Sequence, residues 1–507
     1  MGSAAGASAQ LGSRITSINP ATGEPLGEVP DMAAAEVRVA VEAARAAQRA
    51  WGELSIDARC RRVLRFAEVL MARAEEVIDL LVREGGKTRL EALGMEVVLV
   101  ADLVRYFAKH APQMLAPEPI PLHLMKHRAS YLHFTPRGVI GVIAPWNFPF
   151  SIPIGETMMS LLAGNGVVLK PSEITPLVAL KARELYLAAE LPPDLFQIVT
   201  GRGATGAALI DSGIDYCVFT GSVATGKKVA AACGERLIPC TLELGGKAPA
   251  IVCADADLDR TAQAIAWGGF ANSGQVCASV ERVYAVDSIH DALVDRVVAE
   301  TQRLRQGDPS TPDVDIGAMA WDQQVAHVEK LVAQAVAAGA EVRTGGHRRP
   351  GAGQFFEPTV LVNCKQDMDV MRKETFGPVI PIARVADEDE AVRLANDSHL
   401  GLLAYVFTRD RVRGKQLAER VEAGTVMIND VLATYGCPET PWGGVKHSGI
   451  GRTHSIIGLR DLCETRHVNH DRVAMPREVW WYPYKESTYK ALLKAGRLLF
   501  GKRFWQR

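Results

Sequence analysis

Short apolar segments rich in β-branched residues alternate with segments of helical periodicity through most of the chain. After residue 137 the apolar runs are GVIGVIAP, GVVLK, FQIVT, YCVF and APAIVC, with helical periodicity between them at 152–162, 176–190, 204–211 and 224–234. After residue 258 the runs VERVYAV, PVIPIARV, AYVFT and TVMIN continue the pattern. Apolar strands that alternate with helices form parallel sheets covered by helices. The sequence therefore predicts two α/β domains, with Glu243 near their boundary and Cys277 in the second.

The N-terminal part of the chain follows a different pattern. Apolar residues at helical spacing predict three helices, over 34–51, 57–83 and 90–110. Gly85 and Gly86 supply a stop signal for the second helix, and the proline-rich segment 112–121 predicts a connector. Segment 122–135 predicts two short strands around a turn. Because an isolated hairpin is marginally stable, we expect it to recruit a partner strand.

Composition limits the classes of function. A chain of 507 residues is long enough for about three domains, and a hydrophobic content of 48% supports large cores. The formal net charge of −1 and the aromatic content of 6% give no sign of a nucleic-acid partner. No uncharged apolar run reaches the length of about 18 residues that predicts a membrane span.

The cysteines and the N-terminus point to the cytoplasm. The nine cysteines are odd in number and include no CxxC pair, which is typical of a reducing compartment and predicts no metal site. Residues 1–13 are small and polar, lack the features of a secretory signal, and predict a disordered lead segment.

The segment GGFANSGQVCA presents the thiol of Cys277 among residues of minimal bulk. Cysteine is the best soft nucleophile among the side chains once a base or a lowered pKa makes the thiolate. Glu243, 34 residues upstream in TLELGGKAP, is a candidate base, and the glycines Gly245 and Gly246 beside it permit close approach of backbone and ligand. Alternatively, the cysteine is a small buried hydrophobe and the Glu-Gly-Gly a surface turn.

Two glycine motifs resemble nucleotide-binding loops. TGRGATGAAL carries GxGxxG at Gly201, Gly203 and Gly206, but no acidic residue ends a strand about 20 residues later. GSVATGKK, residues 221–228, imitates a P-loop, yet Lys228 stands where a Ser or Thr should bind magnesium. We therefore reject a nucleotide triphosphatase and expect a helix N-terminus that faces a pyrophosphate, or a tight turn without a ligand.

The KPSE segment, residues 170–173, ends a predicted strand. Its lysine and glutamate can both hydrogen-bond a ribose, and the carboxylate suits a free 2′-hydroxyl while it repels a 2′-phosphate. The alternative is a solvated surface pair.

Taken in order, several motifs resemble the NAD(P)-dependent aldehyde dehydrogenase superfamily from about residue 14 to residue 468: PWNFP (145–149), KPSE (170–173), FTGS (219–222), ELGGK (243–247), GQVC (274–277), ETFGP (374–378) and PWGGVKHSGIGR (441–452). The resemblance implies an α/β fold with a Rossmann-type nucleotide domain, an α/β catalytic domain and a small β oligomerisation element. The implied boundaries are an NAD-binding domain at 14–121 and 137–245, a catalytic domain at 246–462, the oligomerisation element at 122–136 and 463–472, and a C-terminal extension at 473–507.

The resemblance also implies the chemistry. Cys277 attacks an aldehyde, and Asn147 with the backbone N–H of Cys277 holds the oxyanion. Hydride transfer to NAD, with NADP as an alternative, then leaves a thioester that water activated by Glu243 hydrolyses to the carboxylic acid. The implied cofactor-binding residues are Ala144, Pro145, Trp146, Lys170, Glu173, Gly203, Phe219, Gly221, Ser222, Thr225, Leu244, Gly245, Glu374 and Phe376.

The substrate pocket departs from many members of the superfamily. Glu156 stands where many carry lysine, and Gly155 replaces a bulkier aromatic residue seen in some, which predicts a roomier funnel. Four mainly apolar residues are pocket candidates: Phe148, Ile152, Val276 and Trp442. No arginine is evident to bind a substrate carboxylate, so we expect an apolar aliphatic or aromatic aldehyde.

Two other classes compete with this interpretation. A CoA-acylating dehydrogenase uses the same thiol, but its members typically lack the glutamate found at 243. A catalytically inactive structural relative is disfavoured by the intact set of Cys277, Glu243 and Asn147.

The C-terminal extension contains WWYPY and a basic, apolar stretch that predicts a helix over 489–500 with leucines on one face. It could lie on an anionic membrane surface. We favour an arm across a neighbouring subunit of a homodimer or homotetramer, because four aromatic residues within five positions supply a large apolar contact. A frayed or self-packed end is the alternative without a function.

Overall fold

The computed structural model describes residues 13–501. The predicted lead segment, apart from its last residue, lies outside this range. Within the range the chain divides into two compact units. One comprises the residues up to 116 together with 134–464, and the other comprises 117–133 together with the residues from 465 onward.

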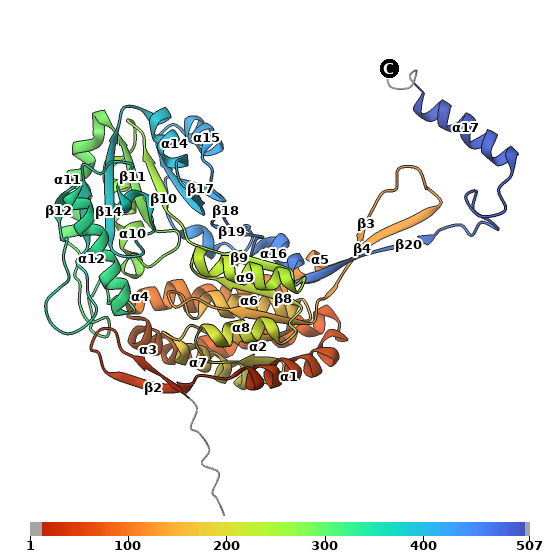
Figure 1. The fold of residues 1–507 in the computed structure, drawn as a ribbon, viewed down its shortest axis with the longest axis horizontal. Coiled ribbons are helices and arrows are strands. Elements are labelled where there is room, and N and C mark those ends of the chain that lie inside the picture. The colour runs from red at the N-terminus through yellow and green to blue at the C-terminus, as the bar shows by residue number, and fades with distance from the viewer. Residues whose placement is uncertain (1–12, 502–507) are drawn as a thin grey trace, which may run out of the picture. The chain divides into compact units, whose positions relative to one another are not determined.

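The first sheet of the larger unit has six strands in the order β19-β9-β8-β5-β6-β7 (Figure 1). Its members are β5 (Val139–Ile143), β6 (Gly166–Lys170), β7 (Phe196–Ile198), β8 (Tyr216–Thr220), β9 (Cys240–Glu243) and β19 (Gly449–Ile450). All pair in parallel except β19, which is antiparallel to β9. The chain runs outward from β5 to β7 and then returns to β8 on the other side of β5. Ligands bind at such switch points, at the carboxyl ends of the strands.

The second sheet has seven strands in the order β12-β13-β14-β11-β10-β16-β17. Its members are β10 (Ala248–Val252), β11 (Val280–Val286), β12 (Glu341–Thr344), β13 (Thr359–Val362), β14 (Val379–Val385), β16 (Leu403–Phe407) and β17 (Thr425–Ile428). Only the edge strand β12 is antiparallel to its neighbour. Both predicted parallel sheets are therefore confirmed, together with every strand predicted for them.

Helices cover both faces of each sheet because successive strand residues point to opposite sides. On the first sheet, Val139 and Ile143 pack with the first helical layer, whereas Ile140 and Val142 pack with the second. The first layer comprises α1 (Ala34–Gly52), α8 (Gly203–Asp211) and α9 (Val223–Glu235). The second comprises α2 (Ile56–Ala72), α3 (Ala74–Gly85), α5 (Leu99–Met114), α6 (Ser151–Leu162) and α7 (Pro176–Ala188).

The second sheet is covered in the same way. One face packs with α10 (Leu258–Phe270) and α11 (His290–Gln302). The other packs with α12 (Asp322–Ala337), α13 (Asp369–Arg372), α14 (Glu388–Asn396) and α15 (Arg411–Arg420). The predicted apolar content is thus divided between the faces of two sheets.

Three N-terminal predictions need correction. The helix predicted over 57–83 is two helices, because the chain leaves the helical conformation at Arg73. The helix predicted over 90–110 contains a π-helical segment, Ala92–Val98, between α4 (Arg89–Glu91) and α5. α5 continues through Pro112 to Met114, so the predicted connector begins too early. One missing N–H near a helix end is tolerated because the buried Ala111 keeps the last turn packed.

The smaller unit contains a three-stranded sheet in the order β20-β4-β3, from β3 (Glu118–Pro119), β4 (Arg128–Pro136) and β20 (Cys463–Asp471). The predicted first strand within 122–135 is wrong: the strand that pairs with β4 lies earlier, at 118–119. The expected partner strand is confirmed as β20. α17 (Glu486–Phe500) follows in the same unit and confirms the predicted helix, which begins three residues earlier than expected. Among the described helices none is both long and apolar enough to cross a membrane.

Candidate active site

A strained turn holds Cys277 in place between α10 and β11. Asn272, Ser273 and Gly274 have positive φ angles of 50°, 57° and 73°. A Cβ at position 274 would lie 2.2 Å from the backbone of Gly377, so only glycine fits there. Gly246 is constrained in the same way, because its Cβ would lie 2.1 Å from the carbonyl oxygen of Cys277. The Glu-Gly-Gly segment therefore packs directly against the cysteine backbone and is not a surface turn.

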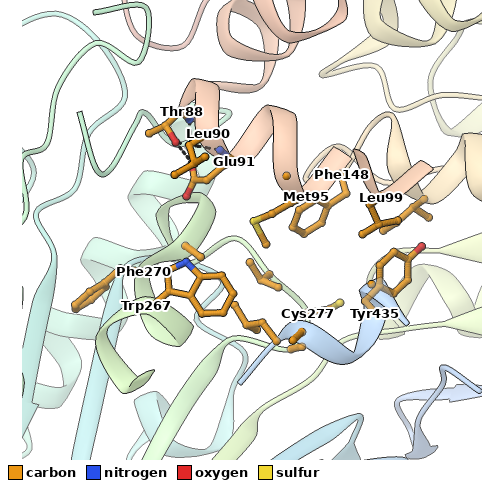
Figure 2. Close-up of a pocket in the computed structure, with 18 of the residues that line it drawn as sticks. Thr88, Leu90, Glu91, Met95, Leu99, Phe148, Trp267, Phe270, Cys277 and Tyr435 are labelled. Carbon is orange, nitrogen blue, oxygen red and sulfur yellow. Dashed lines mark hydrogen bonds between the residues drawn. The ribbon is translucent and has the colours of Figure 1, made fainter. Parts of the chain in front are cut away.

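Cys277 and Glu243 both line one cavity of about 660 Å³ (Figure 2). Most of its wall is apolar. The labelled side chains of Met95, Leu99, Phe148 and Tyr435 lie on the side of the view above Cys277, and Trp267 lies beside it. All four predicted pocket residues line this cavity: Phe148, Ile152, Val276 and Trp442.

The charged residues of the cavity wall have one sign. Its acidic residues are Glu91, Glu156, Glu243, Glu300 and Asp315, and no Lys, Arg or His belongs to the lining formed by the described residues. The cavity is therefore suited to neutral, apolar molecules and poorly suited to anions.

Burial controls the chemistry of the thiol. It raises the pKa of Cys277 to about 12, with further contributions from Glu374 and Glu243. The backbone N–H groups of Ala278 and Cys277 act in the opposite direction. The cysteine is thus a neutral thiol in this state, and its proton must be removed before it can act as a nucleophile.

Glu243 is a buried carboxyl group whose surroundings favour its protonated form. Burial raises its pKa well above the usual range, the negative charge of Glu156 raises it further, and Arg452 opposes both effects. Neither of its carboxyl oxygens makes a hydrogen bond of ordinary geometry within the described range, although the neighbouring Trp442 side chain also lowers the pKa. Buried polar atoms are rarely left without a partner unless a ligand or water completes the site.

A second group of buried polar side chains lies beside Glu243. Burial raises the pKa of Glu156 to about 7 and lowers the pKa of His454 to about 4. The ring of Tyr435 connects this group to the cavity wall, with centroids 4.6 Å from His454 and 4.8 Å from Trp442. Of the two residues predicted to widen the substrate funnel, Glu156 lines the cavity. Gly155 does not belong to the lining, and a Cβ there would lie 3.4 Å from the Leu103 side chain.

A buried ion pair fixes the loop that carries Asn147. Lys87 Nζ pairs with Glu96 and donates to the carbonyl oxygen of Asn147 at 2.8 Å. Glu96 also accepts the N–H groups of Phe150 and Ser151 at 3.1 and 2.6 Å. The Asn147 side chain in turn donates to the carbonyl oxygen of Gln275 at 2.9 Å, which brings it against the cysteine loop.

Most of the predicted cofactor-binding residues gather at the carboxyl edge of the six-stranded sheet. Each group directly follows or ends a strand: Ala144, Pro145 and Trp146 after β5, Lys170 and Glu173 after β6, Phe219, Gly221 and Ser222 at β8, and Leu244 and Gly245 after β9. Ser222 caps α9 by accepting the N–H of Thr225 at 3.3 Å. Gly203 is exposed at the start of α8, with open space where a Cβ would point.

Glu374 and Phe376 come from the second sheet and reach the same edge. Glu374 accepts the N–H of Gly246 at 3.0 Å, and the ring of Phe376 meets the ring of Trp146 edge to face at 5.3 Å. The buried Glu281 fixes their loop by accepting the N–H groups of Thr375 and Phe376 at 2.9 and 2.7 Å. Burial raises the pKa of Glu374 to about 8.

Sequence reasoning missed part of the cavity wall. Met95 and Leu99 are four residues apart on the segment predicted as helix, so periodicity could have placed them on one face. Trp267, Phe270 and Tyr435 carry no local signal, because only the tertiary fold brings them to the cysteine. Within the described range no cluster of His, Cys, Asp or Glu could hold a metal ion.

A family model described as the aldehyde dehydrogenase family matches residues 7–468. A protein of Methylomonas sp named 4,4'-diapolycopene aldehyde oxidase is 36% identical over 94% of this chain and 89% of its own length. A Mycobacterium tuberculosis (strain ATCC 25618 / H37Rv) protein provisionally named an NADP(+) succinate-semialdehyde dehydrogenase is 37% identical over 90% of each chain. The solved structure of an NAD-dependent aldehyde dehydrogenase from Sinorhizobium meliloti has a TM-score of 0.88, with 36% identity over 93% of both chains.

Proposed function

The chain belongs to the aldehyde dehydrogenase family, and on this premise we propose that it oxidises an apolar aldehyde to the carboxylic acid with NAD. The observation that carries the proposal is the shared cavity, in which the Cys277 thiol and the unpartnered Glu243 carboxyl group face one apolar space. The NAD-dependent relative from Sinorhizobium meliloti supports the choice of acceptor.

Cys277 is the nucleophile. Its raised pKa requires a base, and Glu243 is the buried carboxyl group available in the same cavity. Attack on the aldehyde carbon places a negative charge on the substrate oxygen. The backbone N–H of Cys277 and the side-chain amide of Asn147, one of whose N–H groups donates to Gln275 in the resting site, are the donors proposed to stabilise it.

Glu243 acts a second time in hydrolysis. Bound NAD would supply the hydride acceptor, and the substrate carbon held on Cys277 would thereby become a thioester. For hydrolysis, Glu243 must first release to solvent the proton that it took from Cys277. Its carboxylate would then deprotonate a water molecule, which attacks the thioester carbon and expels the Cys277 thiolate. Burial raises the pKa of Glu243, which makes its carboxylate a stronger base and suits this role.

The carboxyl edge of the six-stranded sheet fits NAD. Gly221 has no room for a side chain, since its Cβ would lie 2.7 Å from the Phe219 ring, and Ser222 opens α9, whose first N–H groups favour a phosphate. Lys170 Nζ lies 3.2 Å from Glu173 Oε2, and this pair would hold the adenosine ribose. Glu374 and Phe376 would hold the nicotinamide ribose. The remaining predicted residues at this edge would line the same cofactor, in the proposed NAD-binding domain at 14–121 and 137–245.

The charge of the cavity supports the substrate class. A substrate with a carboxylate, such as succinate semialdehyde, would find no cationic partner in the described lining, and burial of an unpaired carboxylate is costly. An apolar aldehyde instead buries hydrocarbon against Met95, Phe148 and Trp267. The specificity of the Methylomonas relative named for diapolycopene aldehyde agrees better with this cavity than that of the relative named for succinate semialdehyde.

A panel of aldehydes tests both parts of the proposal. We expect NADH formation with decanal or benzaldehyde, and a much lower kcat/KM with succinate semialdehyde. Cys277→Ala should abolish turnover while NAD binding persists. Measurable oxidation by Cys277→Ala, or a preference for succinate semialdehyde, would contradict the assignment. Acceleration by added CoA would instead favour the CoA-acylating alternative.

We propose a catalytic domain at 246–462 and an oligomerisation element at 122–136 and 463–472, as part of a homodimer or homotetramer. The nine cysteines are free, which supports function in a reducing compartment such as the cytoplasm.

A further inference from the structure

The C-terminal segment, residues 472–507, differs in composition from the rest of the chain. It carries nine Lys or Arg and only two Glu, although the whole chain has a formal net charge of −1. It also contains three of the eight tryptophans. A strongly basic, aromatic segment on a nearly neutral chain indicates a partner that is anionic and partly apolar.

The beginning of this segment is fixed to the three-stranded sheet. The N–H of Arg472 donates to the carbonyl oxygen of His127 at 2.8 Å. The buried Glu478 carboxylate lies 3.3 Å from His127 Nε2 and accepts from Arg128 at 3.4 Å. Beyond this anchor, Trp480 and Trp481 are 45% and 53% exposed, so about half of each residue is accessible to solvent next to an ordered sheet.

α17 separates its charged and apolar side chains around the helix axis. Lys490, Lys494 and Arg497 are spaced i, i+4 and i+7, which places all three on one narrow face. Tyr489, Leu492, Leu499 and Phe500 lie outside that face, and Leu493, four residues before Arg497, borders it. No residue of α17 is buried, and each of these five apolar side chains is at least 39% exposed.

A helix with such a surface needs a partner. Isolated helices of about 12–15 residues are marginal in water, and most helical stability comes from the packing of an apolar face. The apolar side also extends to Leu498, which is 75% exposed on the flank of the helix. A protein groove covers a stripe of a helix, whereas a lipid interface accepts a broad apolar side while long basic side chains reach the headgroups.

We propose that residues 472–501 bind the surface of an anionic phospholipid membrane, with α17 lying in the interface. The exposed tryptophans and tyrosines suit the headgroup region, where aromatic rings with a polar edge are favoured. The sequence alone favoured an arm across a second copy of the chain. The arrangement of Lys490, Lys494 and Arg497 favours lipid, because Leu493 and Leu498 border their face and the long basic side chains can reach headgroups while the apolar side enters the interface.

Vesicle flotation with the full chain tests the proposal. We expect flotation with mixed phosphatidylcholine and phosphatidylglycerol vesicles, little with phosphatidylcholine alone, and weaker binding as salt increases. The triple variant K490Q/K494Q/R497Q should partition roughly 100-fold more weakly, from about 1 kcal/mol for each basic residue near the surface. L492D/L499D should abolish flotation. The control K109Q/K330Q/K415Q removes three exposed lysines elsewhere and should float like the wild type.

Three results would overturn the proposal: no flotation of the wild type, equal binding to both vesicle types, or an equal loss in the control triple. A lower oligomeric mass of L492D/L499D by light scattering, without vesicle binding by the wild type, would assign α17 to a second copy instead. Far-ultraviolet circular dichroism of the same samples reports folding of the variants. Because flotation needs no turnover, a failure of the proposed dehydrogenase function leaves this result readable.

Discussion

Removal of the charge on Glu96 should destabilise the protein and also displace Asn147. Glu96 and Lys87 are at most 1% exposed and form an ion pair beneath the loop that follows β5. Glu96→Gln keeps the shape of the side chain but leaves the Lys87 ammonium buried without its counter-ion. Breaking a buried pair on one side costs about 3–5 kcal/mol. We expect a loss of this size in the free energy of unfolding, measured by denaturant titration with two independent probes.

A double variant separates stability from positioning. Lys87→Met combined with Glu96→Gln removes both charges, so most of the lost unfolding free energy should return. The hydrogen bond from Lys87 Nζ to the carbonyl oxygen of Asn147, 2.8 Å long, is still absent. Loss of one oxyanion donor costs about 100- to 1,000-fold in kcat, and displacement of Asn147 should approach that range.

The two measurements should therefore diverge in the double variant, with recovered stability and depressed kcat. A single variant that costs less than about 1 kcal/mol, the scale of an exposed pair, would refute the view that the pair is buried and essential. A double variant with normal kcat would refute the link from Lys87 to Asn147.

Further predictions concern the cavity and the cofactor edge. Glu243→Gln should let a thioester on Cys277 accumulate during turnover, visible by mass spectrometry as an acyl-enzyme; its absence would count against the hydrolytic role. Glu156→Gln removes a carboxyl group that raises the pKa of Glu243, so that pKa should fall and the acidic limb of the kcat profile should move to lower pH; an unchanged limb would show that the two carboxyl groups are not coupled. Glu173→Gln should narrow the preference for NAD over NADP in kcat/KM, and a wild type that prefers NADP would disprove this interpretation of KPSE. Gly246→Ala should eliminate activity, because its Cβ would lie 2.1 Å from the Cys277 carbonyl oxygen, and near-normal kcat would mean that this backbone contact is not required.

Periodicity predicted most strands of the two parallel sheets, because strands buried on both faces read as continuous apolar runs. It missed β9, β12, β13 and β19, each of which has at most four residues. It failed at Arg73 and at Pro112, where the course of the helix depends on packing and not on local composition. Motifs located the cysteine and the residues at the strand ends, since a chemical role restricts residue type and spacing. The wall of the cavity could not be predicted in full: Trp267 and Tyr435 reach it only through the docking of α10 and of a late loop.

The acidic lining of the cavity has a consequence for the direction of turnover. A neutral aldehyde enters without an electrostatic penalty, but hydrolysis converts it into a carboxylate for which no described residue of the lining supplies a cationic partner. A buried anion without a partner loses its hydration, which favours departure of the acid and opposes its return. Product inhibition should therefore be weak, and acid present in excess should leave the initial rate almost unchanged. Turnover would therefore run mainly toward the acid, because the reaction itself creates the charge that disfavours the product in the cavity.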